Sequence, residues 1–176
     1  MRSSRSTIAS LYLEAMNLFK WNFCPSCAGP LVEVTGQPTS RQCARCNEQF
    51  WDSPVSVVAV VAETPEGVVM AHNRAWPPKM LAPITGFIEA REDPLAAAKR
   101  ELKEELGLDA DTAELLGIFP FPAENQLIIA FHIRVSGTMV LGDELDEARV
   151  IAPEKLKAWP FGTGLAIAEF LRRRGV

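Results

Sequence analysis

Apolar positions after residue 54 follow a pattern that is typical of paired strands. Segments 55–63 and 67–72 are rich in β-branched residues, and Thr64-Pro65-Glu66-Gly67 between them has the composition of a turn. We therefore predict a hairpin. The longest uncharged apolar run, 55–62, has eight residues. A membrane-spanning helix needs roughly 20, so we expect no membrane span.

A helical pattern follows further along the chain. Leu95, Leu102 and Leu106 recur at the spacing of one helix face. The pair Asp93-Pro94 supplies a capping side chain and a residue that suits the first helical position. Gly107 stands where a left-handed C-terminal residue is expected. These signals predict a helix from about 94 to 106.

Residues 1–22 are predicted to form an amphipathic helix or a targeting segment. Arg2, Arg5 and several serines are typical of a transit peptide, but Glu14 and Asn17 interrupt any signal-peptide core. Secretion is therefore disfavoured, and we expect a cytoplasmic protein. Apolar residues recur at helical spacing and would suit a lid or a dimer contact: Ile8, Leu11, Ala15 and Phe19.

Composition and charge limit the function classes. The 176 residues are 48% hydrophobic and 23% charged, which is the balance of a globular chain rather than a disordered one. The length allows one ordinary domain and a small accessory module. A formal charge of −4 lacks the basic excess with which dedicated nucleic-acid binders neutralise phosphates. Nonspecific DNA binding is therefore not expected.

Two C-x-x-C pairs, Cys24 with Cys27 and Cys43 with Cys46, lie close together in the chain. Two such turns can supply the four sulfurs that tetrahedral Zn²⁺ prefers, so we predict a zinc ribbon over 23–51. The alternative is a pair of disulfides or a redox motif, but a redox motif does not normally occur twice. Four cysteines leave no open coordination position, so the zinc is expected to be structural.

Three carboxylates crowd one face of the predicted helix. Glu101, Glu104 and Glu105 fall within an arc of about 100°, where like charges destabilise a helix. One interpretation is a solvated face that neighbouring basic residues partly neutralise. The other is a site for hard divalent cations, which take oxygen ligands.

The surrounding residues decide between these interpretations. Gly86, Glu92 and the stretch 100–108 match G-x5-E-x7-R-E-U-x-E-E-x-G-U, with U aliphatic, at every specified position. The chain therefore resembles the Nudix hydrolases over residues 54–176. That resemblance implies an α/β fold, an α/β/α sandwich with a mixed sheet, preceded here by the small four-cysteine zinc ribbon.

The resemblance also implies a metal site. Glu101 and Glu105 are expected to be ligands of Mg²⁺ or Mn²⁺, and Glu104 a further ligand or the base that polarises the attacking water. The main-chain carbonyl of Thr85 is expected to be an additional ligand. Such ions withdraw charge from a pyrophosphate and lower the pKa of bound water.

Other positions of the motif are expected to be structural or to extend the site. Glu92 and Arg100 resemble an ion pair that pins the loop to the helix, and Gly86 permits a backbone course that a Cβ would obstruct. Relatives place another acidic ligand within 143–147, where Glu144 is the better aligned candidate and Glu147 the alternative.

A zinc ribbon ahead of a Nudix domain is the arrangement of the NADH pyrophosphatases and of related enzymes that cleave FAD or ADP-ribose. Of their S-Q-P-W-P-F-P-x-S segment, only Pro120-Phe121-Pro122 remains here, with Phe119 in the place of tryptophan. The two phenylalanines are expected to stack on a base or simply to pack in the core. The resemblance implies a substrate-binding set of Phe119, Phe121, Glu124, Gln126 and Ala166.

The expected function is hydrolysis of a nucleoside diphosphate linked to another moiety, such as NAD(H), FAD or ADP-ribose. The products would be AMP and a second monophosphate. Two alternatives stay open: a nucleotide-sensing or RNA- or protein-binding module, and an enzyme that removes nucleotide caps from RNA. Capped RNA ends are the one nucleic-acid partner expected, and the family resemblance predicts a homodimer.

Overall fold

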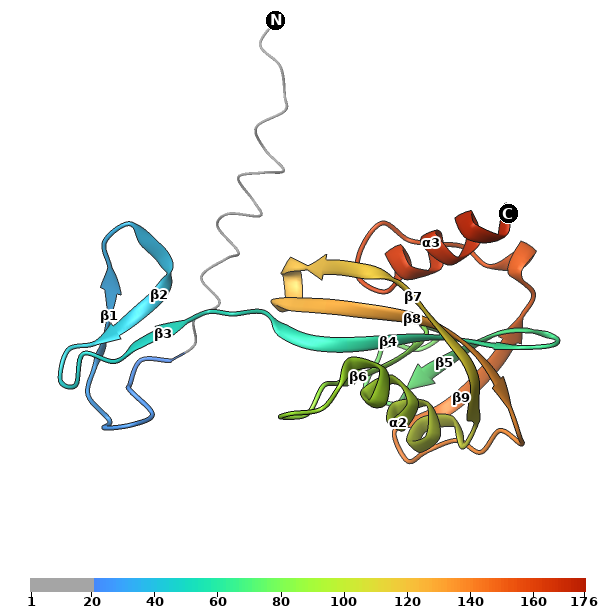
Figure 1. The fold of residues 1–176 in the computed structure, drawn as a ribbon, viewed down its shortest axis with the longest axis horizontal. Coiled ribbons are helices and arrows are strands. Elements are labelled where there is room, and N and C mark those ends of the chain that lie inside the picture. Colours follow the sequence, from blue (N-terminus) through green and yellow to red (C-terminus); the bar gives the residue numbers. More distant parts are fainter. Residues whose placement is uncertain (1–20) are drawn as a thin grey trace, which may run out of the picture. The chain divides into compact units, whose positions relative to one another are not determined.

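The computed structural model describes residues 21–176, and the predictions for residues 1–20 lie outside the described part. Contacts divide the described chain into two compact units. One consists of residues 21–54 together with 122–125, and the other of 55–121 together with 126–176. Each unit has its own sheet (Figure 1).

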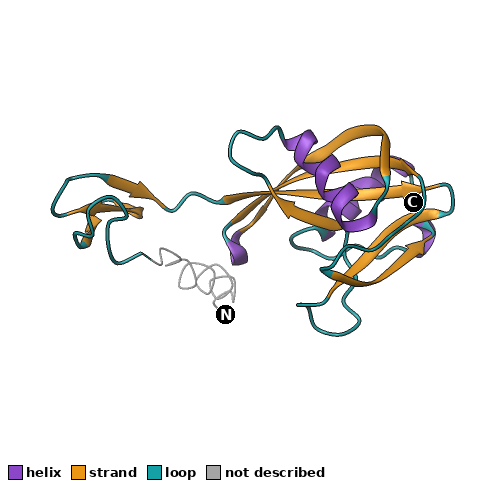
Figure 2. Cartoon of the chain, turned by 90° about the horizontal axis from the view of Figure 1, so that it is seen from below, coloured by secondary structure: helices purple, strands orange, loops and turns teal. Residues whose placement is uncertain are grey.

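The first unit is a three-stranded antiparallel sheet in the order β1-β2-β3. Its strands are β1 (Leu31–Val34), β2 (Gln37–Cys43) and β3 (Gln49–Trp51), joined by loops (Figure 2). Within 21–54 the buried apolar side chains are those of Cys24 and Cys43 alone. This unit therefore has almost no hydrophobic core.

The second unit is built on a six-stranded mixed sheet. The order is β7-β8-β4-β5-β9, with β6 paired to β4; β4 and β8 are parallel and the other pairs antiparallel. The strands are β4 (Val55–Thr64), β5 (Gly67–Asn73), β6 (Ile84–Phe87), β7 (Asp109–Phe121), β8 (Gln126–Ser136) and β9 (Leu145–Ile151).

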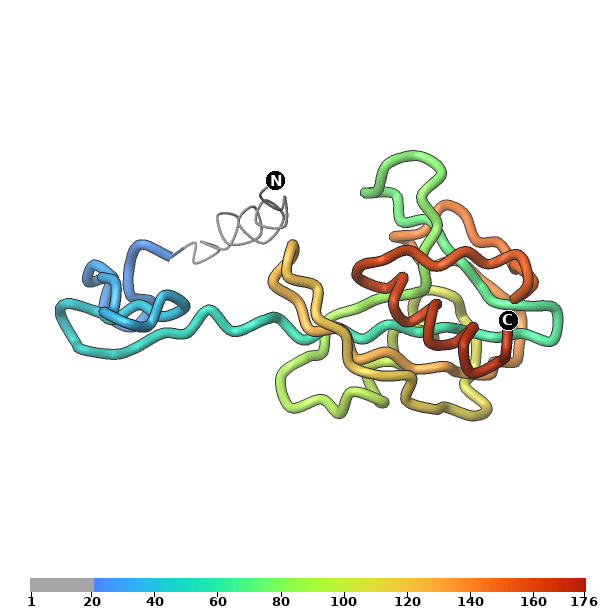
Figure 3. Tube along the Cα trace, turned by 90° about the horizontal axis from the view of Figure 1, so that it is seen from above, coloured from blue at the N-terminus to red at the C-terminus, as the bar shows by residue number. Residues whose placement is uncertain are grey.

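Two helices, α2 (Pro94–Leu106) and α3 (Gly164–Arg174), cover opposite faces of this sheet (Figures 1 and 3). Strand β4 is buried on both faces. Val58 and Val60 belong to the core cluster that includes Leu102 of α2, whereas Val61 belongs to the cluster that includes Phe170 of α3. A strand enclosed in this way needs a continuous apolar run instead of alternation. The predicted α/β/α sandwich with a mixed sheet is confirmed.

The local signals were also confirmed. Strands β4 and β5 form a hairpin in which Thr64 pairs with Gly67. Helix α2 has the predicted bounds, and the Asp93 carboxylate accepts hydrogen bonds from two free amides at its start, those of Leu95 and Ala96. Gly107 ends the helix with φ 67°. No helix in residues 21–176 is long and apolar enough to cross a membrane.

The start of α3 packs closely against the segment that precedes it. The helix begins at Gly164, so Gly164 and Ala166 are helical. A Cβ on Gly164 would lie 2.2 Å from the main-chain oxygen of Trp159. Glycine is therefore required there by close packing inside the protein. Short 3₁₀ turns complete the structure at Pro122–Glu124 (η1) and Pro153–Lys155 (η2).

Candidate active site and metal centre

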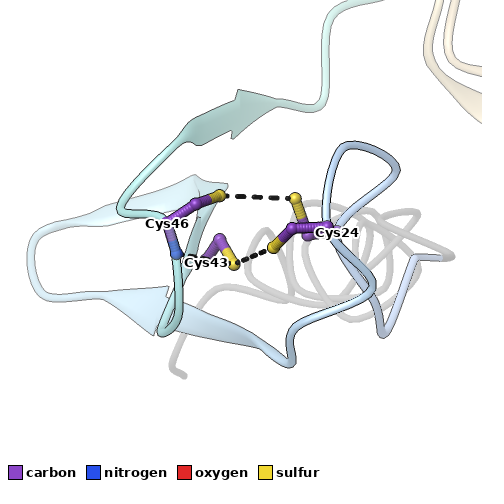
Figure 4. A group of neighbouring side chains, drawn as sticks. Cys24, Cys43 and Cys46 are labelled. Carbon is purple, nitrogen blue, oxygen red and sulfur yellow. Dashed lines mark hydrogen bonds between the residues drawn. The ribbon is translucent and has the colours of Figure 1, made fainter.

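The four cysteine sulfurs of the first unit converge on one point (Figure 4). The Sγ atoms of Cys24 and Cys46 are 3.7 Å apart, those of Cys27 and Cys43 are 3.5 Å apart, and all four lie within 4.8 Å of one another. An ion bound tetrahedrally at about 2.3 Å from each sulfur requires sulfur–sulfur distances of about 3.8 Å. A disulfide needs about 2.05 Å. The donor set therefore fits Zn²⁺, and all four cysteines are free of disulfides.

The two C-x-x-C turns have the same backbone course. The amide of Ala28 donates to the carbonyl of Cys24 at 2.8 Å, and the amide of Asn47 donates to the carbonyl of Cys43 at 2.9 Å. Both donors have positive φ, 58° and 62°. Two similar turns thus present their sulfurs from opposite sides of one centre.

The backbone at Gly29, Arg45 and Cys46 lies close to the sulfur of Cys43. A Cβ on Gly29 would lie 2.9 Å from the sulfur of Cys43, so only glycine fits at that position. Amides of Cys46 and Arg45 donate to the Cys43 sulfur at 3.4 and 3.3 Å. These bonds favour the thiolate and lower the pKa of Cys43 to about 6. Gly29 was missed by sequence analysis because it lies outside the C-x-x-C spacing.

In the second unit, Arg100 connects the loop before α2 to the helix. Its guanidinium binds both carboxylate oxygens of Glu92, at 2.8 and 2.9 Å, and the main-chain oxygen of Phe87 at 3.0 Å. It also donates to Glu101 at 2.7 Å and to Glu104 at 3.0 Å. The Arg100 ion pair is the main cause that lowers the pKa of Glu92 to about 2.

Glu101 lies under this loop, with only 9% of its surface exposed. A Cβ on Gly86 would stand 1.8 Å from the carboxyl carbon of Glu101, so the glycine leaves the space that the carboxylate occupies. Burial raises the pKa of Glu101 even though Arg100 opposes the shift. Gly86 and Glu101 are thus coupled by contact, although 15 positions separate them in the sequence.

Glu105 lines a small cavity of about 20 Å³, which is enough for one water molecule or ion. Its Oε2 atom is the one buried side-chain oxygen or nitrogen in residues 21–176 without a hydrogen-bond partner. Thr85 lies in the same cavity wall, together with Asn73 and Trp76, which no sequence motif marks. Burial raises the pKa of Glu105, and the charges of Glu144 and Glu101 raise it further.

Glu144 and Glu147 have different surroundings. Glu144 accepts a hydrogen bond from the side chain of Asn73 at 3.1 Å, and its charge acts on both Glu101 and Glu105. Glu147 forms an ion pair with Arg149. The carboxylate field at α2 therefore includes Glu144. Glu104, on the same helix, is exposed to solvent.

The carboxylates do not yet form a tight set. Among the described residues, the four cysteines are the only group of three or more His, Cys, Asp or Glu side chains whose ligand atoms lie as close as metal ligands. Like charges repel, and Arg100 holds two of the carboxylates, those of Glu101 and Glu104. A cation would be needed to draw the oxygens together.

The apolar residues expected to bind substrate belong to the core that α3 covers. Phe119 and Phe121 are partly buried against the core that α3 covers. Phe121 stacks on Phe161, with ring centroids 6.2 Å apart, and Phe161 is 55% exposed. Ala166 is fully buried in the same core, so its methyl group presents no surface to a ligand.

The polar members of that set lie at the ends of neighbouring elements. Glu124 is exposed at the end of η1, and Gln126 is half-buried at the start of β8, where it pairs with Val55 and Phe121. Gln126 thus lies directly opposite Phe121 in the sheet. No sequence pattern predicted that Phe161 stacks on Phe121.

A protein-family model described as the NUDIX domain matches residues 52–173. This is more than half of the chain, so the chain belongs to the Nudix hydrolase family. It is similar to an NAD-capped RNA hydrolase, NudC, of Mycobacterium bovis, with 33% identity over 86 residues, which cover 49% of this chain and 28% of the relative.

Longer matches are weaker in identity. The NAD-capped RNA hydrolase ndx-9 of Caenorhabditis elegans is 24% identical over 97% of this chain and 45% of the relative. The chain therefore spans less than half the length of these two relatives. Its fold is similar to the crystal structure of a NUDIX hydrolase from Nitrosomonas europaea, with a TM-score of 0.75, 19% identity and coverage of 88% and 93% of the two chains.

Proposed function

We propose that the chain hydrolyses the pyrophosphate bond of a nucleoside diphosphate linked to another moiety, in a reaction that depends on Mg²⁺ or Mn²⁺. The products are AMP and a second monophosphate when the substrate is NAD(H), FAD or ADP-ribose. The observation that carries this proposal is the buried, unpartnered Oε2 of Glu105 in a cavity beside Thr85. A buried anionic oxygen without a partner is costly, and a cation would stabilise it.

The residues proposed to hold the cation are Glu101, Glu105 and Glu144, with the main-chain oxygen of Thr85. When bound, a divalent cation in such a site withdraws charge from the pyrophosphate and lowers the pKa of coordinated water. Arg100 keeps Glu101 in place through a 2.7 Å bond. Glu104 is exposed, so its carboxylate is open to a water and suits the role of accepting its proton.

The arrangement of the acidic residues supports Glu144 over Glu147 as the additional ligand. The Glu144 charge raises the pKa of Glu105, whereas Glu147 is neutralised by Arg149. The pair of variants Glu144→Gln and Glu147→Gln forms a matched test, because each removes one charge from the same segment. We expect Glu144→Gln alone to raise the Mg²⁺ concentration needed for half-maximal activity.

The relatives' names favour a second candidate substrate, the NAD cap of RNA. The proposed chemistry is the same, since the cap contains the pyrophosphate of NAD. The experiment that tests both candidates incubates the protein and Mg²⁺ with NADH, FAD, ADP-ribose, an NAD-capped oligoribonucleotide and nucleoside triphosphates. Chromatography then resolves the products. The absence of AMP or of a 5′-monophosphate RNA from every substrate would overturn the proposed function.

We propose a structural Zn²⁺ at Cys24, Cys27, Cys43 and Cys46, with no part in the reaction. We also propose a homodimer. Exposed apolar side chains on the first unit support an interaction surface, among them Trp21 and Phe23, which are 55% and 66% exposed. Light scattering on the full chain tests the dimer, and a monomeric mass would contradict it.

A further inference from the structure

Arg91 has a backbone conformation that favours glycine. It occupies the third position of a four-residue turn, in which the amide of Glu92 donates to the carbonyl of Glu89 at 3.1 Å. Its φ is 71°. Turns with positive φ at this position accept glycine without steric cost, whereas a side chain with a Cβ is strained there. The strain has no evident structural reason.

The Arg91 side chain is also without a polar partner among the described residues. It is exposed and forms no hydrogen bond or ion pair with any residue from 21 to 176, although the acidic residues Glu89, Glu92 and Asp93 are within two positions of it. The Asp93 carboxylate accepts from the free amides at the start of α2, and the Glu92 carboxylate is bound by Arg100. The backbone conformation is thus unfavourable for an arginine, and no ion pair with a residue of the described part compensates for it.

The turn that carries Arg91 is fixed to the acidic site. The carboxylate of Glu92 accepts from the amide of Glu89 at 2.9 Å and from Arg100 at 2.8 and 2.9 Å. Arg100 in turn binds Glu101 at 2.7 Å. A free guanidinium is therefore presented from a rigid turn, one residue from the ion pair that positions a proposed metal ligand. Unpaired cations held in this way are suited to an anionic group of the substrate.

We propose that Arg91 binds a phosphate ester of the substrate that lies outside the pyrophosphate being cleaved. The proposal rests on the proposed function. The pyrophosphate itself is assigned to the cations at the carboxylates, and NADH, FAD and ADP-ribose carry no other phosphate. Arg91 therefore selects substrates with an additional one. Two sources share this chemistry: a 2′-phosphate on a dinucleotide, as in NADPH, and the first phosphodiesters of RNA joined to a dinucleotide cap.

The test compares substrates that differ by this phosphate. Initial rates are measured for NADH, NADPH and an NAD-capped oligoribonucleotide, with wild type and Arg91→Gly. We expect Arg91→Gly to raise KM about tenfold for the substrate whose additional phosphate Arg91 binds, since a charge-assisted hydrogen bond is lost. The KM for NADH stays unchanged. If RNA is the source, the salt dependence of KM also weakens, by a logarithmic slope of about 0.7 per lost contact.

Thermal stability separates the roles of backbone and charge. Arg91→Gly removes both the strain and the cation, so Tm rises while selectivity falls. Arg91→Gln removes only the charge and is expected to lose selectivity without the gain in Tm. Arg91→Lys keeps the charge and should restore part of the selectivity.

Lys79 provides the matched control. It has φ 71°, is exposed, and occupies the same position of a turn in which the Met80 amide donates to Pro77 at 3.2 Å. Lys79→Gly thus relieves the same strain and removes the same charge, and it should leave the ratio of the KM values for NADPH and NADH unchanged.

An unchanged KM for all three substrates in Arg91→Gly, or an equal change for NADH and both phosphorylated substrates, would overturn the role of Arg91 and leave the proposed function intact. If wild type hydrolyses none of these three and neither FAD nor ADP-ribose, the proposed function fails instead. Calorimetry then measures the affinities of wild type and Arg91→Gly for NADH, NADPH and the capped oligoribonucleotide. Equal affinities in the two proteins would exclude the proposed role of Arg91.

Discussion

The two candidate metal sites of this chain differ in how each relates to its fold. The sulfur site is local: two similar turns supply all four donors, and the surrounding unit buries only Cys24 and Cys43 among its apolar side chains. The carboxylate site stands on a sandwich whose central strand is buried on both faces. In the first unit the proposed metal would supply most of the folding stability. In the second unit the hydrophobic core supplies the stability and positions the carboxylates.

The same difference appears in the electrostatics. Backbone amides stabilise the thiolate of Cys43, which is the protonation state that binds a metal ion. At α2 the pKa of Glu105 is raised by burial and by neighbouring carboxylates, so that site is unfavourable without a cation. The sandwich tolerates this because its core supplies stability elsewhere. Variants that remove each candidate metal site in turn test this difference most directly.

Loss of the sulfur site is expected to have the largest effect. Replacing Cys43 with serine removes a thiolate, and structural zinc contributes about 10 kcal/mol or more to the folding of small modules. Hydrogen exchange should then show β1 to β3 unprotected while β4 to β9 stay protected. Elemental analysis of wild type should find one zinc per chain.

Ser26→Ala is the control, since Ser26 lies between two ligands without being one. Less than half an equivalent of zinc in wild type, or an unchanged first unit in Cys43→Ser, would contradict the structural role of the metal.

The local character of the sulfur site explains why sequence alone predicted so much of it. C-x-x-C spacing fixes both pairs of ligands within single turns, and the caps of α2 fix the bounds of that helix in the same way. Contacts between distant segments were not predictable. The pairing of Asn73 with Glu144 and the cavity that Glu105 shares with Trp76 depend on sheet order, which no local signal encodes.

The aromatic residues that were expected to bind substrate show the same limit. The proline-phenylalanine segment marks Phe121, but its stacking partner Phe161 comes from a segment 40 positions further along the chain. Helix periodicity placed three glutamates on one face of α2, yet their unequal burial follows from the loop that Arg100 holds over Glu101. Sequence patterns thus predict which residues share a helix face more reliably than they predict the burial of each residue.

The second prediction concerns Glu105→Gln. We expect activity to fall at least about a hundredfold, because the variant loses the charge of a proposed ligand of the catalytic cation. Stability of the metal-free protein should rise, by about 1 kcal/mol or about 2–4 °C in Tm, because a buried anionic oxygen without a partner is removed. Calorimetry of zinc-loaded protein without added Mg²⁺ or Mn²⁺ and the rate of AMP formation measure the two effects.

The pH dependence gives a further check on Glu105. Its pKa is raised in the folded protein, so the folded state binds this proton more tightly than the unfolded state. Metal-free wild type should therefore lose stability as pH rises from about 4.3, the unfolded value, through the raised pKa. Glu105→Gln should lose less over that interval. Equal pH profiles and unchanged turnover would show that the metal assignment is wrong.

A smaller effect is expected from Gly86→Ala, which tests how tightly the fold holds the carboxylate site. The new Cβ would overlap the Glu101 carboxyl group, so that group must leave its place beside Arg100. We expect a destabilisation of about 1–3 kcal/mol, typical of overpacking, and loss of most activity. Denaturant unfolding and initial rates measure these changes.

The double variant Gly86→Ala with Glu101→Ala separates the two effects. Removing the carboxylate relieves the overlap, so stability should return while activity stays low. If the single variant is as stable and active as wild type, the carboxylate is free to move and the site is not fixed by this contact.

The smallest expected effect tests the symmetry of the sulfur site. Ala28 and Asn47 occupy equivalent places with positive φ, but asparagine tolerates this conformation better than alanine. Ala28→Gly should therefore stabilise the folded, zinc-bound unit by about 0.5–1 kcal/mol, after allowance for the greater freedom of glycine in the unfolded chain. This corresponds to roughly threefold tighter zinc binding, measurable by competition with a chelator. Asn47→Gly should change zinc affinity less. Weaker zinc binding in Ala28→Gly would mean that the two turns are not equivalent and that the alanine methyl group contributes a contact of its own.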